Sequence, residues 1–390
     1  MSISQLPEDA GLALLPAGLQ DGLPPEAAYE AEVKEHLIAT LTGHGYERVK
    51  PPLLEFENSL LTGLGEQVAQ QTFRLMDPVS QRMMGLRADM TPQVARIAAS
   101  RLARAPRPLR LCYAGEILRV RGNQLRPERQ FAQVGAELVG SLSPAADAEV
   151  VSLAAEALQA VGIRNLSVDL CLPTLVGILL EEFAVPAEAG RPLRAALDRK
   201  DAAAVRSAGG EQAPLFDGLL RAAGHAGRAL PALHALPLPE SAQALISQLD
   251  EVVSQLWRRA PDLRLTIDPV EHRGYEYQTG LSFTLFATGV RGELGRGGRY
   301  AASIGDGHEE PASGFTLFMD TVLRALPRPE RAKRCYLPYA ADPRHGERLR
   351  GSGWVTISGL QPEKDAVEEA RRLNCSHLLD GEELRELESE

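Results

Sequence analysis

The distribution of strand-like and helical patterns along the chain restricts the fold more than any other feature of the sequence. Strand-like segments gather at residues 46–139 and 263–286, and an alanine- and leucine-rich helical pattern fills about 173–257 between them. Strands and helices therefore do not alternate regularly, as they would in a doubly wound parallel sheet. This arrangement predicts an α+β fold with a helical insertion.

The end of the chain has a different character from the rest. After Pro327 and Pro329, residues 331–390 contain short strand-like segments and one helical pattern. A proline-containing linker before such a stretch is typical of a domain boundary. We therefore predict a core domain at residues 1–326 and a small α/β appendage at residues 331–390.

Composition and charge exclude several classes of protein. The 390 residues are 44% hydrophobic and 24% charged, which is typical of a globular protein. No apolar run approaches the roughly 20 residues of a membrane span, and the first residues make a poor secretory signal. The formal charge of −10 disfavours a general role in coating nucleic acid. Four scattered cysteines, with no metal-ligand spacing, indicate buried thiols in the cytoplasm and predict neither a metal nor a cofactor.

An arginine-rich loop lies between the strand patterns of the first group. Residues 109–113, 117–121 and 130–139 read as strands around it, so Arg119 and Arg121 would share one strand face. Two adjacent cations there could bind an anion. A solvated loop rich in arginine is the alternative interpretation.

Several segments, taken in order, resemble the histidyl-tRNA synthetases over about residues 10–326. They are Leu86-Arg-Ala-Asp-Met-Thr91-Pro, Arg129-Gln-Phe-Ala-Gln133-Val-Gly-Ala-Glu137, Arg273-Gly-Tyr-Glu-Tyr277-Gln-Thr-Gly280 and Gly297-Gly-Arg-Tyr300. The resemblance implies a class II aminoacyl-tRNA synthetase-like core, an antiparallel sheet flanked by helices. It also implies a dimer-interface element near Pro51-Pro52.

The same resemblance implies a site for the amino acid histidine. Histidine carries an ammonium, a carboxylate and a ring with one donor and one acceptor, and each needs a matching group when buried. The positions that match the family's histidine-binding residues are Asp89, Thr91, Gln133, Glu137, Arg273, Tyr277 and Gln278. Taken singly, Asp89 could be an acid at a helix start, and Gln133 and Glu137 could be the polar face of a half-exposed strand.

The chain departs from the synthetases where they bind ATP. Arg119 matches an arginine of the family, but Arg121 stands in place of a glutamate that helps to hold the nucleotide. Thr321 stands in place of an arginine that clamps it, and losing a preorganised donor of this kind typically costs about 10²–10³ in rate. Gln278 replaces a ring-contacting tyrosine. Residues 331–390 are also too few for the family's anticodon-binding domain, which argues against tRNA as a partner.

These departures together resemble the regulatory subunits of ATP phosphoribosyltransferase, the first enzyme of histidine biosynthesis. That resemblance implies a non-catalytic chain, which partners the short form of the catalytic subunit. It would activate that subunit and mediate feedback inhibition by histidine, as a homodimer within a hetero-oligomer. The alternatives are a divergent, active histidyl-tRNA synthetase and a free-standing histidine-binding module.

Overall fold

A computed structural model describes residues 14–61, 69–122, 126–271, 278–303, 309–329 and 332–387. The chain divides into two compact units, Met1–Pro327 and Arg328–Glu390. In the first unit the helices are α1 (Glu26–Gly43), α2 (Glu57–Leu60), α4 (Thr91–Ser100), α5 (Pro144–Ala160), α6 (Leu175–Glu182), α7 (Ala187–Asp198), α8 (Ala202–Ala208), the 3-10 helix η2 (Gly210–Gln212), α9 (Ala213–Ala222), α10 (Ala226–His234), α11 (Glu240–Arg259) and α12 (Met319–Ala325).

The strands of the first unit form a large sheet and a small one. They are β1 (Glu47–Arg48), β2 (Leu54–Phe56), β3 (Arg74–Met76), β4 (Met83–Leu86), β5 (Leu109–Leu118), β6 (Gln130–Val139), β7 (Leu166–Cys171), β8 (Gly224–His225), β9 (Arg264–Asp268), β10 (Gln278–Ala287), β11 (Gly295–Ser303) and β12 (Glu309–Phe318). The large sheet has the order β1-β5-β6-β12-β11-β10-β7-β9-β8, and β2, β4 and β3 form the small one. Neighbours in the large sheet are antiparallel except for β1 with β5 and β7 with β9. This architecture confirms the predicted α+β fold class.

Local sequence explains where the helices of the first unit begin and end. Helix α1 follows Pro24-Pro25, buries a stripe at helical spacing (Val33, Leu37, Ile38 and Leu41) and ends at Gly43. Helix α5 starts at Pro144, and the side chain of Ser143 caps it by accepting a hydrogen bond from the amide of Ala145. Between β7 and β9 the chain is helical from α6 to α11, apart from the two-residue strand β8.

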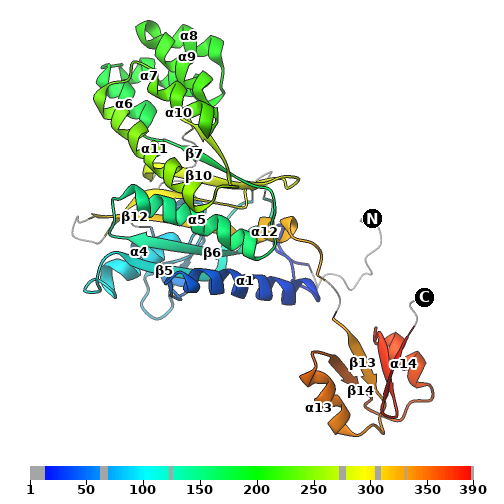
Figure 1. The fold of residues 1–390 in the computed structure, drawn as a ribbon. Coiled ribbons are helices and arrows are strands. Elements are labelled where there is room, and N and C mark those ends of the chain that lie inside the picture. Colours follow the sequence, from blue (N-terminus) through cyan, green and yellow to red (C-terminus); the bar gives the residue numbers. More distant parts are fainter. Residues whose placement is uncertain are drawn as a thin grey trace. The chain divides into compact units, whose positions relative to one another are not determined.

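The two faces of the large sheet are covered differently. Helices α1 and α5 pack on one face of the sheet (Figure 1). The main hydrophobic core lies between these helices and sheet residues such as Val134, Phe283 and Phe315. Helix α4 contacts β6 and β11, and it contributes Val94 and Ala98 to a second, smaller cluster with Phe131 and Phe318. Side chains alternate between faces along a strand. The face that α4 partly covers is therefore the one on which Glu137 and its odd-numbered neighbours on β6 lie.

The second unit is a small α/β fold with its own core. Its elements are β13 (Arg334–Leu337), α13 (Pro343–Gly351), β14 (Val355–Ser358), α14 (Ala366–Arg372), β15 (His377–Asp380) and β16 (Glu383–Glu386). The strands form one sheet in the order β14-β13-β15-β16. Helix α14 contributes Ala370 to one hydrophobic cluster and α13 contributes Leu349 to another. All four cysteines of the chain are unpaired and buried, as predicted. No described helix is both long and apolar enough to cross a membrane.

Candidate functional site

Polar side chains gather on one face of the large sheet, opposite the main core. The register of the strands places Ser282, Gly298, Gly314 and Glu137 side by side across β10, β11, β12 and β6. Residues that are paired in this way point to the same face of a sheet. Gln133 lies four residues from Glu137 along β6 and therefore shares this face. We refer to Thr91, Tyr113, Gln133, Glu137 and Tyr300 as the Glu137 cluster.

Glu137 is a buried carboxyl group surrounded by hydroxyl groups. Thr91 and Tyr113 donate hydrogen bonds to its Oε1 at 3.0 and 3.1 Å, and Tyr300 donates to its Oε2 at 2.9 Å. The Glu137 side chain is 1% exposed, and this burial raises its pKa from 4.5 to about 8. The three hydroxyl donors oppose the rise, since they stabilise the carboxylate. Tyr113 also bonds to Thr316 at 2.8 Å, which extends the network to β12.

Gln133 and Asp89 lie where the loop before α4 meets β6. The Oε1 of Gln133 accepts a hydrogen bond from the amide of Met90 at 3.1 Å, but its Nε2 is buried and has no partner among the described residues. Asp89 is half-buried, and its carboxylate accepts from the amide of Thr91 at 2.9 Å. Asp89 therefore does bond to the first residue of α4, which is what we expect if it is only an acid at a helix start. That bond occupies only one of its acceptor sites.

The opposite end of the polar face contains two oxygen atoms without partners. The Oε1 of Gln278 and the Oγ of Ser282 are buried and accept no hydrogen bond from the described residues. Gln278 and Glu137 each fold over a glycine. A Cβ atom at Gly298 would lie 1.9 Å from Oε1 of Gln278, and one at Gly314 would lie 1.7 Å from Oε2 of Glu137. Only glycine is compatible with these two positions.

The predicted site residues are thus partly brought together by the fold. Thr91, Gln133 and Glu137 converge, Asp89 is beside them, and Gln278 lies on the neighbouring part of the same face. Arg273 and Tyr277 are outside the described residues. Tyr113, Tyr300 and Ser282 were not assigned to the histidine site from the sequence, although Tyr300 ends one of the matching segments. Tyrosine in a buried strand is usually a core residue, so its pattern gives no separate signal.

Arg119 and Arg121 do not share a strand face, because β5 ends at Leu118 and not at Arg121 as predicted. The first predicted strand, 109–113, and only residues 117–118 of the second belong to one continuous strand, β5. The guanidinium of Arg119 lies 5.1 Å from the centre of the Phe131 ring, and burial lowers its pKa to about 10. Arg121 is exposed, and its amide donates to Oε1 of Gln71 at 3.1 Å.

A different arginine of the loop, Arg126, fills the space beside Arg119. Its guanidinium lies 4.0 Å from the ring centre of Phe318 and 4.8 Å from that of Phe131. Its Nε forms a buried ion pair with Asp320 at 2.8 Å, and its Nη2 donates to the hydroxyl of Thr321 at 3.3 Å. The residue in place of the family's clamping arginine, Thr321, is therefore bonded to an arginine of the chain itself. The sequence could not predict this contact, since the partners are 195 residues apart.

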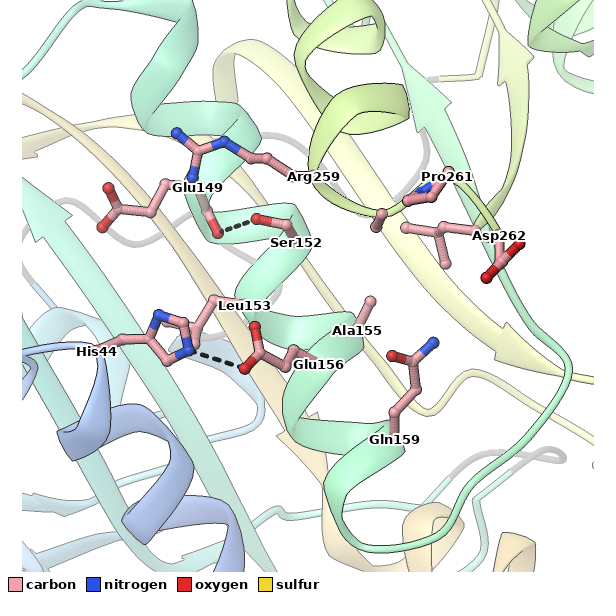
Figure 2. A pocket seen from close by; sticks show the side chains of 12 residues that line it. His44, Glu149, Ser152, Leu153, Ala155, Glu156, Gln159, Arg259, Pro261 and Asp262 are labelled. Atoms are coloured by element: carbon pink, nitrogen blue, oxygen red, sulfur yellow. Dashed lines mark hydrogen bonds and ion pairs between the residues drawn. The ribbon is translucent and has the colours of Figure 1, made fainter.

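A hollow of about 510 Å³ lies elsewhere on the first unit, between the end of α1, α5 and the end of α11 (Figure 2). Two of its acids are already engaged. Glu156 bonds to His44 at 2.9 Å, and Glu149 accepts from Arg110 and from Tyr46. None of its lining residues has a buried polar atom that lacks a partner. The Glu137 cluster, in which Nε2 of Gln133 is such an atom, is therefore the stronger candidate for a binding site. Among the described residues, no three acidic, histidine or cysteine side chains are grouped to hold a metal ion.

Comparison with known proteins places the chain in a family. A sequence model described as histidyl-tRNA synthetase matches residues 18–322. A protein of Rhodospirillum centenum named ATP phosphoribosyltransferase regulatory subunit is 55% identical over 98% of this chain and 98% of its own length. The chain belongs to the ATP phosphoribosyltransferase regulatory subunits. A second relative with the same name, from Paramagnetospirillum magneticum, is 55% identical over 98% of this chain and its own full length.

Solved structures agree with this assignment at the level of the fold. A protein of Bacillus halodurans, described as an ATP phosphoribosyltransferase regulatory subunit/histidyl-tRNA synthetase, superposes with a TM-score of 0.79 at 22% identity, covering 92% of this chain and 96% of its own. Histidyl-tRNA synthetase from a Nostoc species gives 0.77 at 19% identity over 94% of this chain and 90% of its own. The class II synthetase-like core is thus confirmed. As a member of this family, the chain is a non-catalytic regulatory subunit of an enzyme complex.

Proposed function

We propose that this chain binds free histidine at the Glu137 cluster and thereby regulates the catalytic subunit of ATP phosphoribosyltransferase in histidine biosynthesis. It would raise the activity of the short-form catalytic subunit and transmit inhibition by the end product. The observation that carries the proposal is Glu137 itself. It is a carboxyl group buried in a hydroxyl cage, on the same face of the sheet as amide and hydroxyl atoms that have no partner among the described residues.

The chemistry of histidine suits the groups on this face. When Glu137 is ionised, its carboxylate has about four acceptor positions, and the described hydroxyl groups occupy three of them, so one remains for a ring N–H. The half-buried carboxylate of Asp89 is available for the ammonium group. The family resemblance implies that Arg273 binds the carboxylate of the histidine ligand, and that Tyr277 and Gln278 contact the imidazole ring of the ligand.

The contacts of Arg126 argue against the alternative of an active synthetase. Arg126 bonds to Thr321 and packs on Phe131, the ring that Arg119 also contacts. The two positions that correspond to the family's nucleotide-binding residues, Arg119 and Thr321, therefore have an internal guanidinium between them. A nucleotide could enter there only if the buried pair of Arg126 and Asp320 opened.

Regulation requires that histidine distinguish two arrangements of the complex. A ligand shifts such an equilibrium by no more than its differential affinity for the two states. We expect the chain to act as a homodimer within a hetero-oligomer in the cytoplasm, without tRNA. The anion site at Arg119 and Arg121 stays a separate prediction, and charge reversal at Arg121 tests it.

The decisive experiment measures histidine binding and regulation in the reconstituted complex. Calorimetry should show histidine binding to the chain with its catalytic partner, and Glu137→Gln should abolish both binding and inhibition. Glu156→Gln, an exposed carboxylate paired with His44, is the matched control and should change neither. Absence of histidine binding to the wild-type complex would refute the proposal. Histidine-dependent exchange of pyrophosphate into ATP would instead support an active synthetase.

The partner is tested separately, by isolating the chain from its native cell. We expect a phosphoribosyltransferase to be recovered with it. Recovery of a different enzyme in its place would point to the free-standing histidine-binding module.

A further inference from the structure

Ser282 faces the same side of the sheet as Glu137, three strands away. The paired positions run from Ser282 through Gly298 and Gly314 to Glu137, so the two residues between the serine and the glutamate carry no side chain of their own. At roughly 4.8 Å per strand, their Cα atoms are about 14 Å apart. Much of that distance is spanned by Glu137, which folds over Gly314, and by Gln278, which folds over Gly298.

The hydroxyl group of Ser282 has no visible structural purpose. The residue is 0% exposed, and its Oγ has no hydrogen-bond partner among the described residues. A buried polar group without a partner lowers stability, so natural proteins rarely keep one. A neighbouring residue also has a polar atom without a partner in the described part of the chain. Oε1 of Gln278, which lies over Gly298, is also buried and without a partner among the described residues. Two buried polar atoms without a partner among the described residues, Oε1 of Gln278 and Oγ of Ser282, therefore belong to residues that lie beside Gly298.

Ser313 provides the contrast within the same sheet. It is as buried as Ser282, at 1% exposed, but its hydroxyl donates to the carboxylate of Asp147 at 2.5 Å, and Asp147 also pairs with Arg299. That serine is a structural residue, whose bond helps to hold β12 to α5. The difference between the two serines is the presence of a partner, not the depth of burial.

We propose that Ser282 is a specificity-determining residue of the histidine site and that its hydroxyl binds the imidazole ring of the ligand. This inference rests on the proposed function. A neutral imidazole has one N–H and one bare nitrogen. Glu137, as an acceptor, takes the N–H, and a hydroxyl group can donate to the bare nitrogen. Ser282 supplies such a donor on the same face. It lies at the opposite end from Glu137 of the glycine row, which consists of Gly298 and Gly314.

The proposal predicts opposite effects of one substitution on binding and on stability. Ser282→Ala removes a hydrogen bond that forms only with the ligand, so the affinity for histidine should fall by about 3- to 10-fold, as for a typical neutral hydrogen bond. The same change removes an unmatched polar group from the unliganded protein. Its thermal midpoint should therefore stay unchanged or rise. A residue with a merely structural role would show a lower midpoint.

The test compares Ser282→Ala with Ser313→Ala in the full-length chain assembled with its catalytic subunit. Histidine titration by calorimetry gives the affinity, and a thermal scan without histidine gives the midpoint. We expect Ser313→Ala to lower the midpoint and to leave the affinity within about twofold, since its lost bond is made to Asp147 and not to a ligand.

The outcomes separate the two proposals. If the wild-type complex binds no histidine, the proposed function fails, and the role of Ser282 fails with it. If the wild type binds and Ser282→Ala binds equally well, the proposed function stands and the role of Ser282 is refuted. A lowered midpoint with unchanged affinity would show that Ser282 is structural.

Discussion

Replacing Glu137 by glutamine should change how the stability of the first unit depends on pH. The pKa of Glu137 is about 8 in the folded chain and 4.5 for an ordinary glutamate. Between these values the folded state keeps a proton that the unfolded state releases. The contribution of protonated Glu137 to the free energy of unfolding is therefore complete below about pH 4.5. It falls as the pH rises between these two values and is lost above about pH 8.

The size of the effect follows from the shift in pKa. One unit corresponds to about 1.36 kcal/mol, so ionised Glu137 costs on the order of 5 kcal/mol as an upper limit. Glutamine does not titrate, and it fits the same cage. Its oxygen can accept from Thr91 and Tyr113, while its amide group can donate to the hydroxyl of Tyr300. The variant should match the wild type near pH 5 and be more stable by several kcal/mol at pH 9.

Urea unfolding at pH values from 5 to 9 provides the assay. The chain has two tryptophans, Trp257 in the first unit and Trp354 in the second. A Trp354→Phe background leaves Trp257 to report on the unit that contains Glu137. Taking the difference between variant and wild type cancels the titration of other groups, such as Asp147, whose pKa is also raised by burial. Glu156→Gln serves as the control. A difference between Glu137→Gln and wild type that is constant over this pH range would refute the reasoning.

Other contacts give further predictions. Asp320→Ala removes the carboxylate that holds the buried Arg126 and should lower the free energy of unfolding by about 3–5 kcal/mol in urea, and a loss below 1 kcal/mol would contradict the importance of this pair. Gly314→Ala places a Cβ atom 1.7 Å from Oε2 of Glu137, so it should displace that side chain and abolish histidine binding by calorimetry. Gly351→Ala, where no described atom lies within 4 Å, should leave binding and stability unchanged. Equal behaviour of the two alanine variants would argue against the glycine row.

The sequence predicted those parts of the fold that depend on neighbouring residues. The stripe that α1 buries and its end at Gly43 follow from helical spacing and from glycine. Thr91-Pro92 does open a helix, and residues 130–139 do form a strand. Residues 109–118 form one strand, whereas the sequence pattern predicted two, at 109–113 and 117–121. The pattern does not reveal where pairing with β6 stops. That error put Arg119 and Arg121 on one face.

The site was predictable only where a short segment contains its residues. Gln133 and Glu137 are four apart on one strand, so their common face is visible in the sequence. The order of the motifs likewise connected them to Asp89 and Thr91. Nothing local indicates that Tyr300 would donate to Glu137, or that Arg126 would pair with Asp320. These partners are separated by 163 and 194 residues.

By itself, then, the sequence determined the class of fold, the polar residues available for a histidine site and the loss of the family's nucleotide-binding side chains. Tertiary structure alone decided which of those polar groups are satisfied. Strand register aligned Ser282 and Glu137 across two glycines, and folding buried both. The physical reason is that hydrogen bonding and desolvation depend on distances between atoms far apart in the chain. Periodicity fixes only the direction in which each side chain points.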